Sequence, residues 1–210
     1  MVISDIEKEI WQEGYTTIAY CDEVGRGCLF GPVLAAAIIL PKGLIIEGIK
    51  DSKKLSPKKR LEAYELIMQQ AIAIGIGKVH AHTIDVINIK NATRLAMKNA
   101  ILNLQDPNGN SIKPDFLLID AEEVNLDIPQ KSIVKGDDLI HGIAAASIVA
   151  KVRRDALFTD WHKKYPVYGL DTNKGYGTKA HREAIVKYGI SDQHRKSFLK
   201  KILAHSWRSG

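Results

Sequence analysis

TTIAYCDEVGRGCLFGPVLAAAIIL, residues 16–40, contains two β-forming segments around a glycine-rich turn. Thr16–Asp22 is rich in residues that favour strands. Val33–Leu40 is apolar throughout, as in a buried strand. Glu23–Pro32 holds three glycines and has the composition of a turn. Two strands around a short turn predict an antiparallel hairpin.

Further elements are predicted on both sides of this hairpin. Ser4 and Glu7 form a capping-box pattern before a short helix, and Ser56–Pro57 is a typical helix start. Asp137 or Asp138 is expected to cap a long helix that ends near Lys164. The predicted helices are 5–13, 57–70, 83–104, 137–164, 179–187 and 193–204, and the later strands are 71–80, 115–120 and 132–134. Alternating strands and helices predict an α/β fold with a mixed central sheet flanked by helices. We expect residues 1–164 to form the main domain and residues 165–210 a helical region packed on it, as a single compact unit.

The composition excludes several classes of protein. The chain has 210 residues, of which 45% are hydrophobic and 26% charged, as in an ordinary globular domain. Its two cysteines, Cys21 and Cys28, are too few for a disulfide framework or a four-cysteine zinc site. Apolar runs such as Val33–Leu40 are too short to span a bilayer. The start MVISDIEKEIW has no apolar core of a secretory signal. These features predict a cytoplasmic protein with no membrane partner.

Charge is distributed unevenly along the chain. Residues 1–150 contain 16 Lys and Arg against 19 Asp and Glu, a net charge of −3. Residues 151–210 contain 14 against 5, a net charge of +9. A basic C-terminal region on an acidic body is typical of a polyanion-binding protein, above all one that binds nucleic acid. A solvated basic face is the alternative interpretation.

Acidic residues occur at the predicted ends of strands. Asp22 and Glu23 end the first strand of the hairpin, Asp120 ends DFLLID, and Asp137–Asp138 follow a short strand. Ligands of open α/β sheets gather at the C-terminal ends of strands, and carboxylates that meet there would favour Mg²⁺ or Mn²⁺. Two such ions about 4 Å apart can promote phosphodiester hydrolysis. Neighbouring strand residues point to opposite faces, so Asp22 and Glu23 are expected to share a site only if the chain turns there. The alternative is that each acid is a cap or a turn residue.

Two glycine-rich segments are candidates for substrate binding. Gly25, Arg26 and Gly27 form a turn directly after the acids. Its backbone can approach a ligand closely, and its arginine can donate to a phosphate. In the segment 173–178, NKGYGT, Tyr176 could stack on a base or sugar while lysines meet phosphates. An ordinary hairpin turn and a loop with Tyr176 packed on the core are the alternatives.

Together these segments resemble the ribonuclease HII family. The matching stretches are YCDEVGRGCLFGPV (20–33), DSKKLS (51–56), INIKNATRLAMKNAI (87–101), LLID (117–120), KGDDLIHGIAAASIVAKVRRD (135–155), NKGYGTKAH (173–181) and HRKSF (194–198). They follow one another in the family's order and span most of the chain. The resemblance implies a ribonuclease H-like fold with a C-terminal helical part. It also implies hydrolysis of the phosphodiester on the 5′ side of ribonucleotides, both in RNA–DNA hybrids and singly embedded in duplex DNA, leaving 3′-hydroxyl and 5′-phosphate ends.

The resemblance also implies roles for individual residues. It makes Asp22, Glu23, Asp120 and Asp137 the catalytic ligands of Mg²⁺ or Mn²⁺, with two ions during catalysis. It makes Gly25, Arg26 and Gly27 the turn whose backbone reads the ribose 2′-hydroxyl, and Tyr176 the residue that packs against the next sugar. Lys53, Lys174 and Lys179 are the candidate phosphate contacts. It implies a monomer. Ser206–Gly210 shows no clear motif for binding a replication clamp.

Some features depart from the family pattern or leave alternatives open. Tyr20–Cys21 stands where small or aliphatic residues are frequent, and Ala121 where glycine is frequent. Arg26 and the short segment before the first motif favour ribonuclease HII over the sister family, ribonuclease HIII. The alternatives are a ribonuclease HIII-like hybrid nuclease, a DNA-directed nuclease of the same fold, and a binding module without catalysis.

Overall fold

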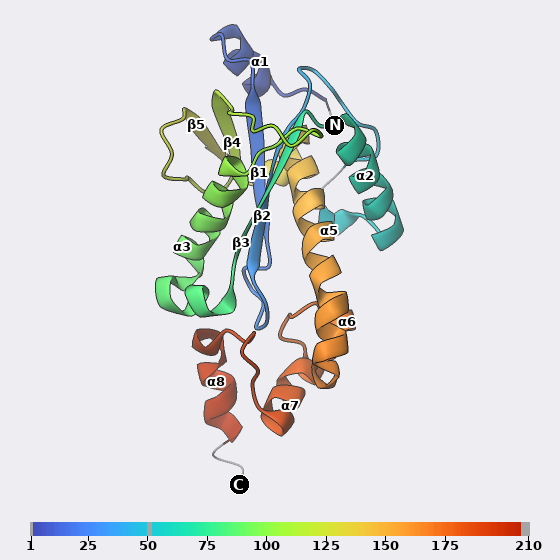
Figure 1. The fold of residues 1–210 in the computed structure, drawn as a ribbon, viewed down its shortest axis with the longest axis vertical. Helices are drawn as coiled ribbons and strands as arrows, with labels where there is room; N and C mark the ends of the chain where they lie inside the picture. The colour runs from blue at the N-terminus through green and yellow to red at the C-terminus, as the bar shows by residue number, and fades with distance from the viewer. Residues whose placement is uncertain (1, 50–51, 207–210) are drawn as a thin grey trace.

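The computed structural model describes residues 2–49 and 52–206. Asp51 of the DSKKLS stretch and residues 207–210 of the predicted C-terminal region lie outside the described residues. A five-stranded sheet with the order β3-β2-β1-β4-β5 forms the centre of the molecule (Figure 1). Its strands are β1 (Ile18–Val24), β2 (Val33–Ile39), β3 (Ala73–Val79), β4 (Phe116–Asp120) and β5 (Gln130–Ile133).

The predicted hairpin forms two neighbouring strands of this sheet, β1 and β2. β2 pairs antiparallel with both β1 and β3. β1 pairs parallel with β4, and β4 with β5. The sheet is therefore mixed, as predicted. Because β1 and β4 run in the same direction, their C-terminal ends meet at one edge of the sheet.

Each face of the sheet is covered by helices, because alternate residues of each strand point to opposite sides. Tyr20, Leu34 and Leu118 pack with residues of α2 and α5 on one face. Cys21, Ala35 and the other strand residues whose side chains point to the second face pack against α3. Figure 1 shows α3 on one side of the strands and α2 and α5 on the other. The helices are α1 (Asp5–Gln12), α2 (Pro57–Gln70), α3 (Ala81–Leu102), α4 (Gly136–Leu139), α5 (His141–Lys164), α6 (Leu170–Asn173), α7 (Lys179–Tyr188) and α8 (Lys196–Ser206).

Three predicted helix starts differ from the structure. The last helix begins at Lys196 and not at residue 193. The third predicted helix begins after His80, so its predicted start at residue 83 lies inside it. This helix is also interrupted at Asn88, whose φ is 64°, and the Asn88 side chain accepts a hydrogen bond from the Asn91 N–H. Neither Asp137 nor Asp138 caps the long helix α5. Both lie in the short helix α4, and an extended residue, Ile140, separates α4 from α5.

The C-terminal helices pack against the turn of the hairpin. Phe30 from that turn lies in a small core with Phe158, Tyr168 and Leu199. Asp85 of α3 accepts hydrogen bonds from the first two backbone N–H groups of α8, each at 2.9 Å. Within the described residues, no helix is long and apolar enough to cross a membrane.

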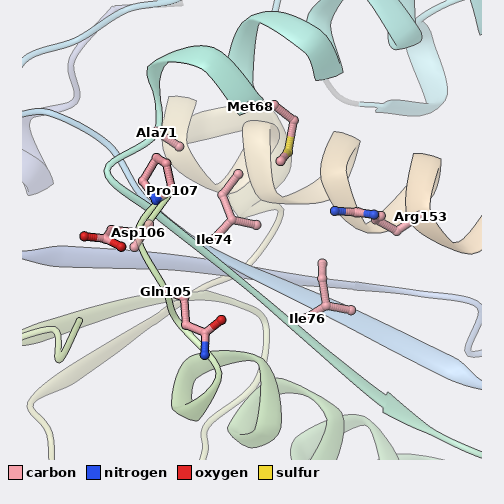
Figure 2. Close-up of a pocket in the computed structure, with 9 residues that line it drawn as sticks. Met68, Ala71, Ile74, Ile76, Gln105, Asp106, Pro107 and Arg153 are labelled. Atoms are coloured by element: carbon pink, nitrogen blue, oxygen red, sulfur yellow. The ribbon is translucent and has the colours of Figure 1, made fainter. Parts of the chain in front are cut away.

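A cavity of about 240 Å³ lies against the outer strand β3. Met68 of α2, Ile74 and Ile76 of β3, and Arg153 of α5 contribute to its lining (Figure 2). None of the described residues that line it is a predicted site residue, so the candidate chemistry lies elsewhere on the molecule.

Candidate active site

Three carboxylates meet at the edge where β1 and β4 end. Asp22 and Glu23 come from β1 and Asp120 is the last residue of β4. One carboxylate oxygen from each lies within 4.8 Å of the other two. Parallel pairing of the two strands accounts for this convergence, since it brings their C-terminal ends side by side.

The two neighbouring acids share the site without a turn between them. We expected the chain to turn at this point, but β1 continues to Val24. The Asp22 carboxylate instead accepts a hydrogen bond of 2.7 Å from the backbone N–H of Glu23. This hydrogen bond directs the Asp22 side chain along the strand toward Glu23.

Burial and mutual repulsion disfavour the charged forms of these groups. Burial raises the pKa of Asp22 well above its usual range, and the charges of Glu23 and Asp120 raise it further. Burial likewise raises the pKa of Glu23, against the opposing effect of Arg26. Burial also raises the pKa of Asp120, although this carboxylate accepts a 2.6 Å hydrogen bond from the Gly136 N–H. The three carboxylates therefore need a positively charged partner if all of them are to remain ionised in this buried site.

The donor set fits a hard divalent cation. All three groups offer carboxylate oxygens, the ligands that Mg²⁺ and Mn²⁺ prefer. Oε2 of Glu23 is buried and has no hydrogen-bond partner among the described residues. A buried carboxylate oxygen without a partner is costly, and a bound cation would remove that cost.

Asp137, the fourth predicted ligand, lies beside this cluster. It is buried in α4, and its charge contributes to the raised pKa of Asp120. Nζ of Lys53 lies 3.2 Å from Oδ2 of Asp137. The neighbouring Asp138 is more exposed and forms an ion pair with Lys54. The structure therefore brings Lys53 to the edge of the acidic site.

The predicted Gly-Arg-Gly turn borders the carboxylates. Gly25 has a φ of +90°, and Gly27 has open space where a side chain would project. Nη1 of Arg26 lies 3.6 Å from Glu23 and 3.3 Å from Glu122. Glu122 is buried and also accepts a hydrogen bond of 2.9 Å from Arg94. Sequence reasoning missed Glu122 and Arg94 because they lie 96 and 68 residues from Arg26 and carry no local motif.

Tyr176 lies next to this turn, through an antiparallel bridge with Cys28. Its side chain is 41% exposed, so part of the ring is open to a ligand. Lys174, two residues earlier, adopts a left-handed conformation with a φ of 48°. Lys179 is almost fully exposed at the start of α7 and lies 3.9 Å from Glu183. Tyr176 is therefore only partly packed on the core, and its exposed part lies beside the Gly-Arg-Gly turn.

Two arginines of the basic C-terminal part do not face solvent. Arg154 and Arg195 are completely buried. Both donate hydrogen bonds to backbone carbonyls of the turn region. Both arginines belong to the basic C-terminal region and to family-matching stretches of the sequence, but neither was predicted to have a role of its own.

The chain matches known proteins over most of its length. The family model described as Ribonuclease HII matches residues 20–201. The chain is 64% identical over 199 residues to a protein named ribonuclease HII from Alkaliphilus oremlandii, covering 95% of this chain and 98% of that protein.

Solved structures share the fold. Ribonuclease H2 from Pyrococcus horikoshii superposes with a TM-score of 0.75 at 22% identity, covering 92% of this chain and all of that one. A Bst-RNase HIII structure in complex with Mn²⁺ gives a TM-score of 0.68 at 18% identity, covering 94% of this chain and 72% of that one. The predicted ribonuclease H-like fold is therefore confirmed. With a family model over more than four-fifths of its residues and a close relative over nearly its full length, the chain belongs to the ribonuclease HII family, a family of endonucleases.

Proposed function

We propose that this enzyme hydrolyses the phosphodiester on the 5′ side of ribonucleotides, in RNA–DNA hybrids and at single ribonucleotides within duplex DNA. The products carry 3′-hydroxyl and 5′-phosphate ends. The observation that carries this proposal is the convergence of Asp22, Glu23 and Asp120 within 4.8 Å beside the Gly-Arg-Gly turn. Family membership supports the nuclease chemistry.

In this proposal the carboxylates hold Mg²⁺ or Mn²⁺. Asp22, Glu23, Asp120 and Asp137 are the ligands, and the unpartnered Glu23 oxygen supports that assignment. When bound, two such ions activate a water and stabilise the leaving oxygen. The protein holds the carboxylates in place through the backbone N–H groups of Glu23 and Gly136. Lys53 balances the charge of Asp137 at the edge of the site.

The turn and Tyr176 recognise the ribose. The 2′-hydroxyl both donates and accepts hydrogen bonds, and it distinguishes RNA from DNA. The backbone of Gly25, Arg26 and Gly27 contacts it without an intervening side chain, since nothing lies within 4 Å of the position that a Cβ of Gly27 would take. Tyr176 packs its exposed ring against the following sugar.

Basic residues outside this centre bind the nucleic-acid backbone. Lys53, Lys174 and Lys179 are the proposed phosphate contacts, which give affinity that depends on salt and not on sequence. The protein acts as a monomer, with residues 1–164 as the catalytic domain and 165–210 as a packed helical region in one unit. We also place its activity in the cytoplasm.

Cleavage of three labelled duplexes tests the proposal. One duplex is all DNA, one carries a single ribonucleotide, and one is an RNA–DNA hybrid, each assayed with Mg²⁺ and with Mn²⁺. We expect cleavage 5′ to the single ribonucleotide and none of the all-DNA duplex. Asp22→Asn should lower the rate at least about 100-fold, because a ligand of the cation loses its charge. Asp160→Asn, which alters an exposed carboxylate on α5, is the matched control and should keep full activity.

The other outcomes identify the competing functions. Cleavage of the hybrid alone would indicate a ribonuclease HIII-like preference. Cleavage of the all-DNA duplex would show that the 2′-hydroxyl is not read. Binding without cleavage, unchanged by a chelator, would contradict the proposed metal site.

A further inference from the structure

Two buried guanidinium groups lie behind the Gly-Arg-Gly turn. Arg154 of α5 and Arg195, immediately before α8, both have no exposed surface. Within residues 2–49 and 52–206, neither forms an ion pair with a carboxylate at 4 Å or less. Burying an arginine is expensive unless its donors are satisfied, so their hydrogen bonds indicate what these side chains hold in place.

Arg195 binds three carbonyls of the turn region. Its Nη2 donates to Gly25 at 2.7 Å, its Nη1 to Arg26 at 2.8 Å, and its Nε to Gly31 at 2.9 Å. The backbone N–H of Arg195 also donates to the Leu29 carbonyl at 2.9 Å. A planar fork of N–H groups suits this arrangement, because it fixes the directions of several carbonyls at once. Gly25 and Arg26, two of the residues expected to read the ribose, are therefore fixed by hydrogen bonds from the buried Arg195.

Arg154 links the same segment to the loop that carries Tyr176. Its Nε donates to Pro32 at 3.2 Å and its Nη2 to Phe30 at 3.4 Å. Its Nη1 donates at 3.0 Å to the carbonyl of Lys174, two residues before Tyr176. The guanidinium carbon lies 5.9 Å from the centre of the Tyr176 ring. The turn and the tyrosine are thus connected through one side chain.

We propose that Arg195, together with Arg154, is a positioning residue for ribose discrimination. The two guanidinium groups hold the Gly-Arg-Gly turn and the Tyr176 loop in one geometry, so that backbone and ring meet the ribose and the next sugar together. Neither arginine touches the substrate. This inference rests on the proposed function, because the two arginines are said to position the groups that the proposed function assigns to reading the 2′-hydroxyl.

The two substrates should respond differently if this geometry loosens. In a hybrid every nucleotide of one strand carries a 2′-hydroxyl, so a displaced turn still meets a ribose in each register. A single embedded ribonucleotide carries one 2′-hydroxyl, so the turn contacts it in only one position of the enzyme along the duplex. Loss of a positioning group should therefore affect the single-ribonucleotide duplex more than the hybrid, because positioning contributes strongly to rate.

The test compares kcat and KM for both substrates in Arg195→Lys, Arg154→Lys and Arg153→Lys. Lysine keeps the charge but lacks the fork. Arg153 is the matched control, because it is exposed and adjacent to Arg154 on α5. Thermal unfolding of each variant gives its folded fraction, and rates are expressed per folded molecule. We expect Arg195→Lys to lower kcat/KM for the single-ribonucleotide duplex at least about tenfold more than for the hybrid, and Arg153→Lys to leave the ratio unchanged.

Each other result is decisive. Equal losses on both substrates, or no loss, would overturn the inference and leave a purely structural role. If Arg195→Lys does not fold, the same ratio in Arg154→Lys decides the question. Wild-type protein that leaves the single-ribonucleotide duplex intact would refute the proposed function, and this inference with it. Wild-type cleavage with an unchanged ratio in the variants would overturn the inference alone.

Discussion

Gly25 combines two constraints that a side chain would violate. Its φ is +90°, and a Cβ built on it would lie 2.3 Å from Nε of Arg154. We expect Gly25→Ala to lower the free energy of unfolding by about 3 kcal/mol, because backbone strain adds to displacement of a buried arginine. Urea unfolding monitored by circular dichroism measures this change.

Gly14→Ala separates the two costs. Gly14 also has a positive φ, +98°, but nothing lies within 4 Å of the position of its Cβ. This variant should lose only the backbone term, about 1–2 kcal/mol. Equal losses in the two variants would show that Arg154 yields freely and does not hold the turn.

Individual site residues differ in how far the sequence reveals them. Asp22, Glu23 and Asp120 could be grouped in advance because each lies at or near the C-terminal end of a predicted strand, where ligand sites of open α/β sheets gather. Arg94, Glu122, Arg154 and Arg195 could not, since their partners are distant in sequence and their burial depends on the finished fold. The burial of the two arginines was not predicted, because arginines are rarely fully buried and the charge of a segment does not show which of its side chains lie inside.

The local start signals of α1 and α2 predicted these helices well, whereas the cap expected at Asp137 or Asp138 was wrong. The capping box of α1 forms as expected, with Ser4 and Glu7 bonded reciprocally. α2 has the predicted bounds, Pro57–Gln70, because Ser56 and Pro57 define its start. The interruption at Asn88 and the break at Ile140 have no comparable signal. The break at Ile140 follows the short helix α4. The backbone N–H of Gly136, the first residue of α4, donates a hydrogen bond to Asp120 in the acidic site.

The start of α8 is held by another helix, which supports one packed unit. Asp85 of α3 accepts from the N–H groups of Lys196 and Ser197 and from the Ser197 hydroxyl. A carboxylate at a helix N-terminus typically contributes about 0.5–2 kcal/mol. We expect Asp85→Ala to lower the free energy of unfolding by that amount and to increase amide hydrogen exchange in α8 first.

Asp160→Ala is the control for this prediction. Asp160 is an exposed residue of α5 whose ion pair with Lys163 spans 3.6 Å at the surface, and such pairs contribute little. Unchanged exchange in α8 of Asp85→Ala would show that the helix is held by its apolar face alone.

Across the whole molecule, the charge division along the chain does not correspond to a division of the structure. The division at residue 150 falls inside α5, whose first part packs in the central core and whose second part belongs to the basic last 60 residues. Part of the basic charge lies inside, on Arg154 and Arg195, and part lies at the surface, as on Lys179. Net charge therefore indicated a nucleic-acid partner correctly as a class, while the location of that charge required the fold.

The buried His141 of α5 should destabilise the folded protein as the pH falls from neutral to mildly acidic. The His141 imidazole is buried and accepts a hydrogen bond of 3.0 Å from the Ile46 N–H. Burial lowers the pKa of His141 from 6.5 to about 4. As the pH falls below 6.5, His141 therefore becomes protonated in the unfolded chain but stays neutral in the folded chain. The free energy of unfolding decreases as a result, until the pH approaches 4.

A glutamine at position 141 should reduce this pH dependence. Its side-chain oxygen can still accept from Ile46, but it does not titrate. We expect wild-type protein to lose about 1–2 kcal/mol more stability than His141→Gln between pH 7 and pH 5, measured by urea unfolding at both values. His82→Gln, which changes an exposed histidine of α3, should follow the wild type. If His141→Gln loses as much stability as the wild type, the buried imidazole does not cause the acid sensitivity.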